Sequence, residues 1–130
     1  MKTIRFAALL LCLLILEPLR GAEPKSDTPK QFIYVLHLVP RLHDDKAWTE
    51  QDKAALGRHF NRFKAAIESG QLILAGRTEE PGEKTFGIAI FQAADEAAAR
   101  QFMNEDPAVA GGQMTAELHP FRVALERKNP

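Results

Sequence analysis

The chain has 130 residues, with 17 basic and 17 acidic side chains, so its formal net charge at neutral pH is zero. A chain of this length is typical of a single domain. The balanced charge excludes the strongly basic surface with which proteins bind nucleic acid, so we expect no nucleic-acid partner.

The first 22 residues have the pattern of a secretory signal peptide. Lys2 and Arg5 precede an unbroken apolar run over residues 6–16, and Pro18 follows it. The run is too short to cross a bilayer comfortably, so we expect no stable membrane insertion after cleavage. The sequence therefore predicts a periplasmic or secreted protein.

The only cysteine, Cys12, lies inside this apolar run. After cleavage the protein has no thiol, which excludes a disulfide framework, a thiolate nucleophile and a cysteine zinc site. Residues 23–30 are polar and contain two prolines, as is typical of a linker. A single domain is expected over residues 31–127.

Hydrophobic periodicity predicts strands and helices in this domain. In chain order we expect a strand over 32–39, a helix over 49–69, strands over 72–76 and 85–91, a helix over 95–105 and a strand over 113–125. The turn Glu80-Pro81-Gly82-Glu83 joins the second and third strands into a hairpin. The order β-α-β-β-α-β predicts a ferredoxin-like α+β fold, in which both helices pack on one face of an antiparallel sheet.

The longer predicted helix has recognisable ends and an apolar side. Thr49 and Asp52 have capping-box spacing at its start, and Gly70 follows its last residue. Apolar residues at helical spacing predict the side that is buried. They are Leu56, Phe60, Phe63 and Ile67.

The sheet is expected to have an apolar face that no helix covers. Two helices cover only one face, and the strands carry Val, Leu and Ile on both. Apolar patches of this kind usually mark an interface. A second copy packed sheet to sheet would cover them, so the sequence predicts a homodimer, a dimeric α+β barrel with a closed interior. A monomer with an exposed apolar face is the alternative.

Several segments resemble the YCII-related proteins, a family of small dimeric α+β barrel proteins. The segments are Phe32-Ile33-Tyr34-Val35, His59 to Gly76, Asp106-Pro107-Ala108-Val109-Ala110-Gly111 and Ala116-Glu117-Leu118-His119-Pro120-Phe121. The resemblance covers nearly the whole domain, and the Asp-Pro segment is its most specific part. Two positions depart from the family pattern. Arg77 stands where members usually carry proline, and Gly112-Gln113 stands where a branched or aromatic residue is common.

The resemblance implies an active site made of His59 and Asp106. It also implies elimination or isomerisation on small unsaturated acids or lactones, with the imidazole as general base, as in a few relatives. The chemistry is reasonable on its own terms, because an imidazole both takes and gives protons near neutral pH. A neighbouring carboxylate fixes its tautomer and stabilises the cation. Such a pair needs no metal, and we expect no cofactor.

Each member of the pair also has a purely structural interpretation. His59 lies on the flank of the predicted apolar stripe, where a half-buried structural histidine is common. Asp106 precedes Pro107, and a carboxylate in that position often binds the backbone of the following turn.

Four further residues are candidates for substrate binding, namely His37, Arg77, Glu117 and His119. His37 would line the barrel interior, or serve as a core histidine. Arg77 ends the second strand and can bind a carboxylate through two parallel hydrogen bonds. Glu117 and His119 lie in the last strand, where a cross-strand pair is the structural alternative.

The cluster His43-Asp44-Asp45 lacks a second spaced pair of ligands, so we expect no metal site. The sequence therefore predicts a small exported enzyme of the lyase or isomerase type. It would use His59 and Asp106 for general acid–base chemistry, namely elimination, isomerisation or hydrolysis, on a small organic acid or enol. The alternatives are a non-catalytic module that binds a small-molecule ligand and a structural dimer without a pocket.

Overall fold

The structure is a computed structural model that describes residues 29–127. The predicted signal peptide, with Cys12, lies outside these residues, as does most of the predicted linker. No helix within residues 29–127 is both long enough and apolar enough to cross a bilayer.

The described residues form four strands and three α-helices. The strands are β1 Lys30–Leu38, β2 Leu72–Arg77, β3 Gly87–Ala93 and β4 Met114–Phe121. The α-helices are α1 Glu50–Glu68, α2 Glu96–Asn104 and α3 Pro107–Ala110. Three short 3₁₀ helices complete the chain, η1 Pro40–His43, η2 Asp45–Ala47 and η3 Gly82–Lys84.

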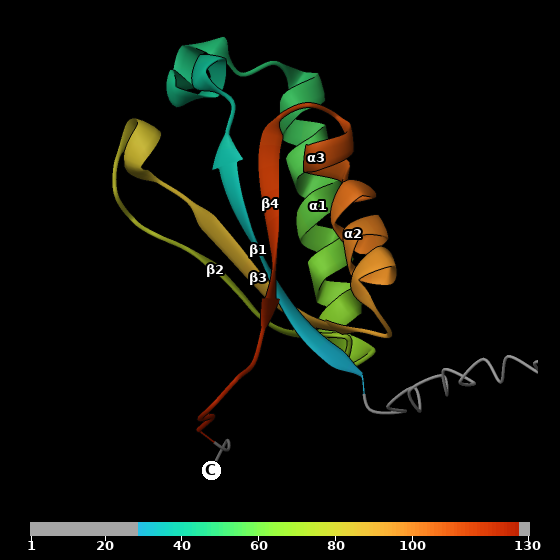
Figure 1. The fold of residues 1–130 in the computed structure, drawn as a ribbon. Helices are drawn as coiled ribbons and strands as arrows, with labels where there is room; N and C mark the ends of the chain where they lie inside the picture. Colours follow the sequence, from blue (N-terminus) through green and yellow to red (C-terminus); the bar gives the residue numbers. More distant parts are fainter. Residues whose placement is uncertain (1–28, 128–130) are drawn as a thin grey trace, which may run out of the picture.

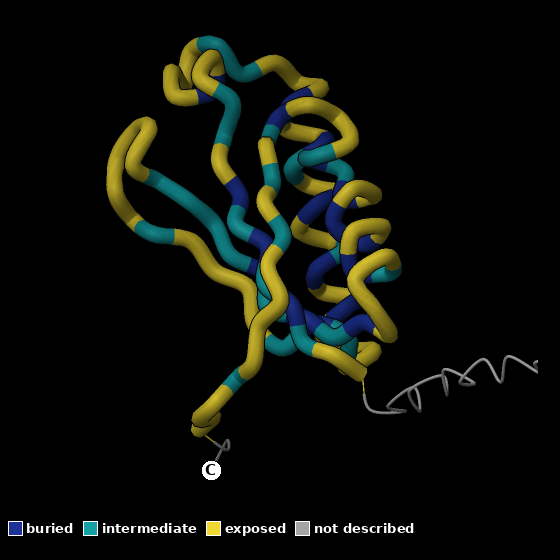
Figure 2. The backbone as a smooth tube through the Cα atoms, viewed as in Figure 1, coloured by how far each residue is buried: buried dark blue, intermediate teal, exposed yellow. Residues whose placement is uncertain are grey.

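The strands make one antiparallel sheet in the order β2-β3-β1-β4. All three α-helices lie on the same face of this sheet (Figure 1). Buried residues concentrate between the sheet and the helices, and the outer sides of the helices are exposed (Figure 2). The predicted ferredoxin-like α+β fold is therefore confirmed.

The ends of α1 follow from local chemistry. The backbone N–H of Asp52 donates to Thr49 Oγ1 at 3.2 Å, and the N–H of Thr49 donates to Asp52 Oδ2 at 2.9 Å. This capping box provides partners for backbone donors that a helix start leaves unpaired. After the helix, Gly70 has φ 77°, a conformation that glycine adopts without the clash of a Cβ atom.

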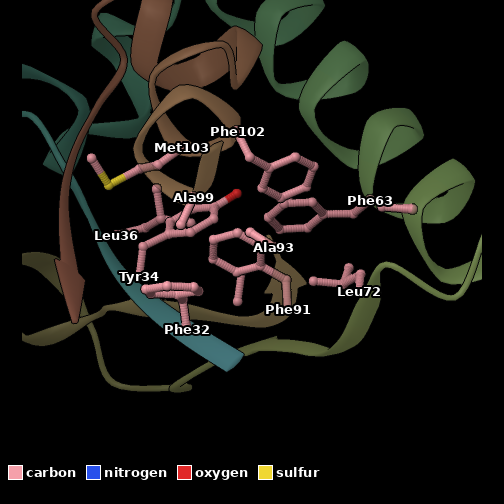
Figure 3. Packing of buried hydrophobic residues seen from close by; sticks show 12 residues of the cluster. Phe32, Tyr34, Leu36, Phe63, Leu72, Phe91, Ala93, Ala99, Phe102 and Met103 are labelled. Carbon is pink, nitrogen blue, oxygen red and sulfur yellow. The ribbon is translucent and has the colours of Figure 1, made fainter. Parts of the chain in front are cut away.

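Aromatic side chains from both layers fill the core (Figure 3). Tyr34 and Phe91 are fully buried, and their rings meet edge to face with centroids 5.5 Å apart. The ring of Phe102, from α2, stacks on Phe91 at 4.7 Å. Burial of such a side chain stabilises the folded state by about 1.5–3 kcal/mol.

The buried side of α1 differs from the prediction. Phe63 is buried as expected, but Phe60 and Ile67 are 59% and 50% exposed. The sheet-facing stripe instead consists of Asp52, Ala55, His59, Phe63 and Ala66. Small alanines let the helix lie close to the sheet. The stripe also brings His59 to a buried polar partner on another element, which no local pattern reveals.

The last part of the chain also departs from the prediction in detail. Residues 107–110 form α3, a short helix that the sequence analysis missed. The strand β4 ends at Phe121, not at Leu125, which is 95% exposed. Beyond Phe121 the backbone no longer pairs with β1, whose partner for that residue is Gln31.

Candidate functional site

Asp106 lies between α2 and α3 because Pro107 ends one helix and starts the next. A residue before proline is disfavoured in helical geometry, so Asp106 takes a non-helical conformation, with φ −58° and ψ 125°, at the N-cap of α3. Its Oδ1 accepts a hydrogen bond from the N–H of Ala108 at 2.9 Å. The side chain is fully buried, so its second oxygen also needs partners from the protein.

His59 provides one of these partners from the middle of α1. Its Nδ1 lies 2.7 Å from Oδ1 and 2.8 Å from Oδ2 of Asp106. The two residues are 47 positions apart in the chain. The imidazole also packs on Phe63, with ring centroids 4.3 Å apart, which restricts its rotation.

Tyr34 provides the other partner from the centre of β1. Its hydroxyl donates to Oδ2 of Asp106 at 3.0 Å. The sequence analysis missed this contact. The signal was the hydroxyl itself on the buried face of the first strand, because a buried tyrosine hydroxyl usually has a hydrogen-bond partner.

The electrostatics of the trio determine where its protons lie. Burial acts to raise the pKa of Asp106, but the hydrogen bonds and charge of His59, with those from Ala108 and Tyr34, outweigh it and hold the pKa below its usual range. The carboxylate is therefore ionised and only accepts hydrogen bonds. Nδ1 of His59 must then carry a proton, so Nε2 is the free nitrogen of the neutral ring.

Tyr34 stays protonated in the same arrangement. Burial first, and then the negative charge of Asp106, raise the pKa of its hydroxyl far above the usual value. The hydroxyl thus remains a donor to the carboxylate over the whole range in which proteins normally work.

A cleft of ≈ 540 Å³ opens beside His59. It lies between α1, the end of β2 and the start of β3, where the hairpin runs away from α1 towards η3 (Figure 1). Within residues 29–127 the only buried, unpartnered side-chain polar atom is Oε1 of Gln113. His59 lines this cleft with a side chain that is 11% exposed, and its Nε2 has no hydrogen-bond partner within the same residues. The arrangement places a proton acceptor in a mostly apolar hollow.

The profile of the YCII-related domain matches residues 35–122, a span that includes His59 and Asp106. The chain belongs to the YCII-related family. This confirms the resemblance seen in the sequence.

Other comparisons add a structural neighbour only. Nine chains of solved structures match this chain. One is the NE2512 protein of unknown function from Nitrosomonas europaea, which is 16% identical, with 78% of this chain and 97% of that chain covered and a TM-score of 0.39. No curated protein matches the chain.

Arg77 lines the same cleft of the YCII-related domain as His59. It is the last residue of β2 and pairs with Gly87 of β3. Of the four additional binding candidates, it is the one that the structure brings to the cleft beside His59.

The other three candidates lie on the opposite face of the sheet. His37 is exposed on the same side of β1 as Ile33, which pairs with His119 of β4. His119 Nε2 is 3.5 Å from the carboxylate of Glu117, an exposed pair. The central sheet therefore separates these residues from the His59 cleft, and their role in substrate binding stays a prediction.

A second buried carboxylate, Asp52, anchors the start of α1. Arg41 donates to its two oxygens at 2.7 and 2.9 Å, and Gln113 Nε2 donates to Oδ1 at 3.0 Å. The hydrogen bond from Arg41, followed by the bonds from Thr49 and Gln113, holds the pKa of Asp52 far below its usual range. These contacts tie α1 to η1 and to the start of β4, which supports the position of His59.

The His43-Asp44-Asp45 cluster has structural roles. Asp44 accepts a hydrogen bond from the N–H of Lys46 at 2.9 Å, and His43 Nε2 lies 3.2 Å from the carbonyl oxygen of Leu38. Within the described part of the chain, no three His, Cys, Asp or Glu side chains are grouped as metal ligands would be.

Proposed function

We propose that this protein is an enzyme that moves a proton within a small organic acid or enol bound in the cleft. His59 is the general base and general acid, and Asp106 orients it. The observation that carries the proposal is the contact of His59 Nδ1 with a buried, ionised Asp106, because this contact holds a proton on Nδ1 and leaves Nε2, on a side chain that lines the cleft, as the nitrogen that can exchange a proton with a ligand. The reaction types that this pair supports are isomerisation, elimination and hydrolysis.

The steps follow from the two nitrogens of the ring. Nε2 takes a proton from a carbon or hydroxyl of the bound molecule, and the ring becomes an imidazolium. The charge of Asp106, 2.7 Å from Nδ1, stabilises that cation. Return of the proton to another atom of the same molecule completes an isomerisation. In an elimination a neighbouring group leaves with its bonding electron pair, and Nε2 then gives the proton to that group or to water. A positioned acid–base group contributes about 10²–10⁴-fold to a rate.

The test uses enols and unsaturated acids, with the enol form of phenylpyruvate as the reference probe. Its conversion to the keto form is followed by ultraviolet absorbance, and exchange of its carbon-bound protons in D₂O is followed by NMR. We expect the wild-type protein to accelerate both, and His59→Asn and Asp106→Asn to lose the acceleration. His43→Asn is the matched control, because His43 lies outside the cleft.

The outcomes separate the candidate functions. Acceleration that survives in His59→Asn would contradict the proposal. Binding of the probes without any acceleration over buffer would favour the non-catalytic binding module, and absence of both would favour the structural dimer.

We propose that the protein is a homodimer that packs through the face of the sheet opposite the helices. Strand register places Leu74, Ile90 and Ile33 side by side on that face, with Ile88 next to Val35 in the adjacent row. Leu74 is 48% exposed. A second copy of this chain would cover the patch, as expected for a self-complementary interface. The His59 cleft lies on the other face of the sheet, so it is distinct from the barrel interior that such a dimer would close.

We also propose that the protein is exported. The support is the charged start and the apolar run over residues 6–16. Expression of the whole chain followed by fractionation and N-terminal sequencing tests this. A mature protein that begins near residue 22 and is found outside the cytoplasm is the expected result, and an intact cytoplasmic chain would contradict it.

A further inference from the structure

We propose that the cleft selects anionic ligands, and that Arg77 is the residue that binds their carboxylate. The ligand class is a small monocarboxylate with an apolar body. This inference rests on the proposed function only because it assigns Arg77 and His59 to the same cleft. It identifies which part of the substrate each of these two residues contacts.

The direction of Arg77 follows from an irregularity in β2. In a regular strand, alternate side chains lie on the same face, so Leu72 and Arg77 would lie on opposite faces of the sheet. The register between β2 and β3 shifts between Leu72 and Leu74. After the shift, Ala75 pairs with the buried Ala89, so Ala75 and Arg77 both lie on the helix-facing side. Bulges of this kind often re-aim a side chain next to a functional site.

The residue pairs on the two faces of the sheet agree with this placement of Arg77 on the helix-facing side. Leu74 pairs with Ile90, and Ile90 pairs with Ile33 on the face without helices. Arg77 pairs with Gly87, which in turn pairs with Leu36, a buried residue under the helices. The irregularity therefore turns the guanidinium of Arg77 towards the cleft that contains His59.

The charge of the cleft is favourable for an anion. None of the residues that line it is acidic, and Arg77 is the lining residue with a permanent positive charge. Other arginines are engaged, since Arg41 binds Asp52 and Arg100 binds Glu96. In the described part of the chain, the guanidinium of Arg77 has neither a hydrogen bond nor an ion pair with the protein. It is thus available for a ligand carboxylate, which a guanidinium binds through two parallel hydrogen bonds.

The rest of the cleft accommodates an apolar body. Leu56, Phe63 and Met114 line it, and its volume of ≈ 540 Å³ is within the usual range for small-molecule sites. Neither Gly76 nor Gly87, which flank Arg77 in the sheet, carries a side chain that would occupy the space. A ligand held by its carboxylate at Arg77 would extend along this surface towards His59.

The experiment compares an acid with its neutral amide. The probes are cyclohexanecarboxylate and cyclohexanecarboxamide, which have the same ring and differ in charge. Binding is followed by the fluorescence of Trp48, which is the only tryptophan in the chain and lines the cleft, and by calorimetry. We expect the wild-type protein to prefer the acid by about 10- to 100-fold, the usual effect of a charge-assisted hydrogen-bonded pair.

Three variants locate the source of this preference. Arg77→Gln should reduce the preference for the acid to about unity without changing the affinity for the amide, and Arg77→Lys should retain part of it because only the planar fork is lost. Arg122→Gln removes the same charge outside the cleft and should leave the preference intact. A preference that persists in Arg77→Gln, or its absence from the wild-type protein, would overturn the inference.

The two proposals fail separately in these measurements. His59→Asn keeps Arg77, so it should still prefer the acid while losing proton transfer. Proton transfer that depends on His59, without a carboxylate preference that depends on Arg77, would overturn only the ligand assignment. The opposite result would overturn only the catalytic proposal.

Discussion

His59 Nδ1 lies 2.7 Å from Oδ1 and 2.8 Å from Oδ2 of Asp106, and the hydroxyl of Tyr34, from the sheet, donates to the same Oδ2. One helix, one strand and one interhelical turn thus meet at a single buried anion. The arrangement holds the imidazole in one orientation, which is the condition for directed proton transfer.

Asp106→Asn should reduce proton-transfer activity by about 10²–10⁴-fold, because the amide no longer stabilises the imidazolium and can favour the other tautomer. The rate of enol conversion in the wild-type and variant proteins measures this. Circular dichroism spectra establish that both proteins are folded. Activity close to that of the wild type in a folded variant would show that Asp106 is only structural.

The stability that Asp106 contributes should be lost in acid. Its pKa is lower in the folded protein than the value of about 3.9 in an unfolded chain, so the unfolded state takes up the proton first as the pH falls. The contribution is therefore complete above about pH 5 and declines below about pH 4. Urea unfolding of wild type and Asp106→Asn should give free energies whose difference narrows in acid. A difference independent of pH would contradict the assignment of an ionised Asp106.

The single tyrosine of the chain gives a second, independent titration. Because burial and Asp106 raise the pKa of Tyr34, tyrosinate absorbance should not appear near the usual value of about 10 in the folded protein. It should appear only together with loss of the circular dichroism signal. The contribution of Tyr34 to stability is thus present below about pH 10 and is lost as the pH rises. Ionisation of the Tyr34 hydroxyl in the folded protein near pH 10 would show that this hydroxyl is not buried.

Gly87→Leu should close the cleft without unfolding the domain. The φ of Gly87 is not positive, and a Cβ there would meet its nearest neighbour, the Gly76 carbonyl oxygen, at 3.5 Å, an ordinary contact. A larger side chain would occupy ligand space, so the affinity for cyclohexanecarboxylate should fall about tenfold or more with little change in melting temperature. Gly57→Leu, on the exposed side of α1, is the control. Unchanged affinity in Gly87→Leu would place the ligand elsewhere.

Ile33→Asp should convert the proposed dimer into a monomer, because a carboxylate in the middle of an apolar interface would lose its hydration. Size-exclusion chromatography with light scattering gives the mass of each species. Ile67→Asp makes the same chemical change on an exposed part of α1, and its mass should equal that of the wild type. A wild-type protein that is monomeric at micromolar concentration would contradict the proposal.

Local chemistry accounts for the features that the sequence predicted well. The capping box of Thr49 and Asp52, the glycine after α1 and the Asp106-Pro107 stop all depend on neighbours within a few residues. The order of strands and helices follows from periodicity in the same way. These features, with the specific Asp-Pro segment, were sufficient for the fold class and the family.

Other than the pairing of His59 with Asp106, which the family resemblance implied, features that depend on distant partners were wrong or absent. Both Phe60 and His59 lie on α1 near an apolar stripe, and only the contact of His59 with the buried Asp106 shows that His59 is turned inwards while Phe60 stays exposed. The chain order likewise gives no sign of which face of the sheet each strand residue occupies once a register shift intervenes. Without the register shift between Leu72 and Leu74, Arg77 would lie on the face of the sheet opposite the cleft.

By itself, then, the sequence determined the order of the strands and of the two longer helices, the ends of α1 and the family, because caps, turns and periodicity act over a few residues. Only the tertiary structure decided that His59, Asp106 and Tyr34 share one buried contact, that Arg77 opens to the same cleft, and that His37, Glu117 and His119 do not. The physical reason is that burial and hydrogen-bond partners in a folded core are set by strand register and helix orientation, which bring together residues far apart in the chain.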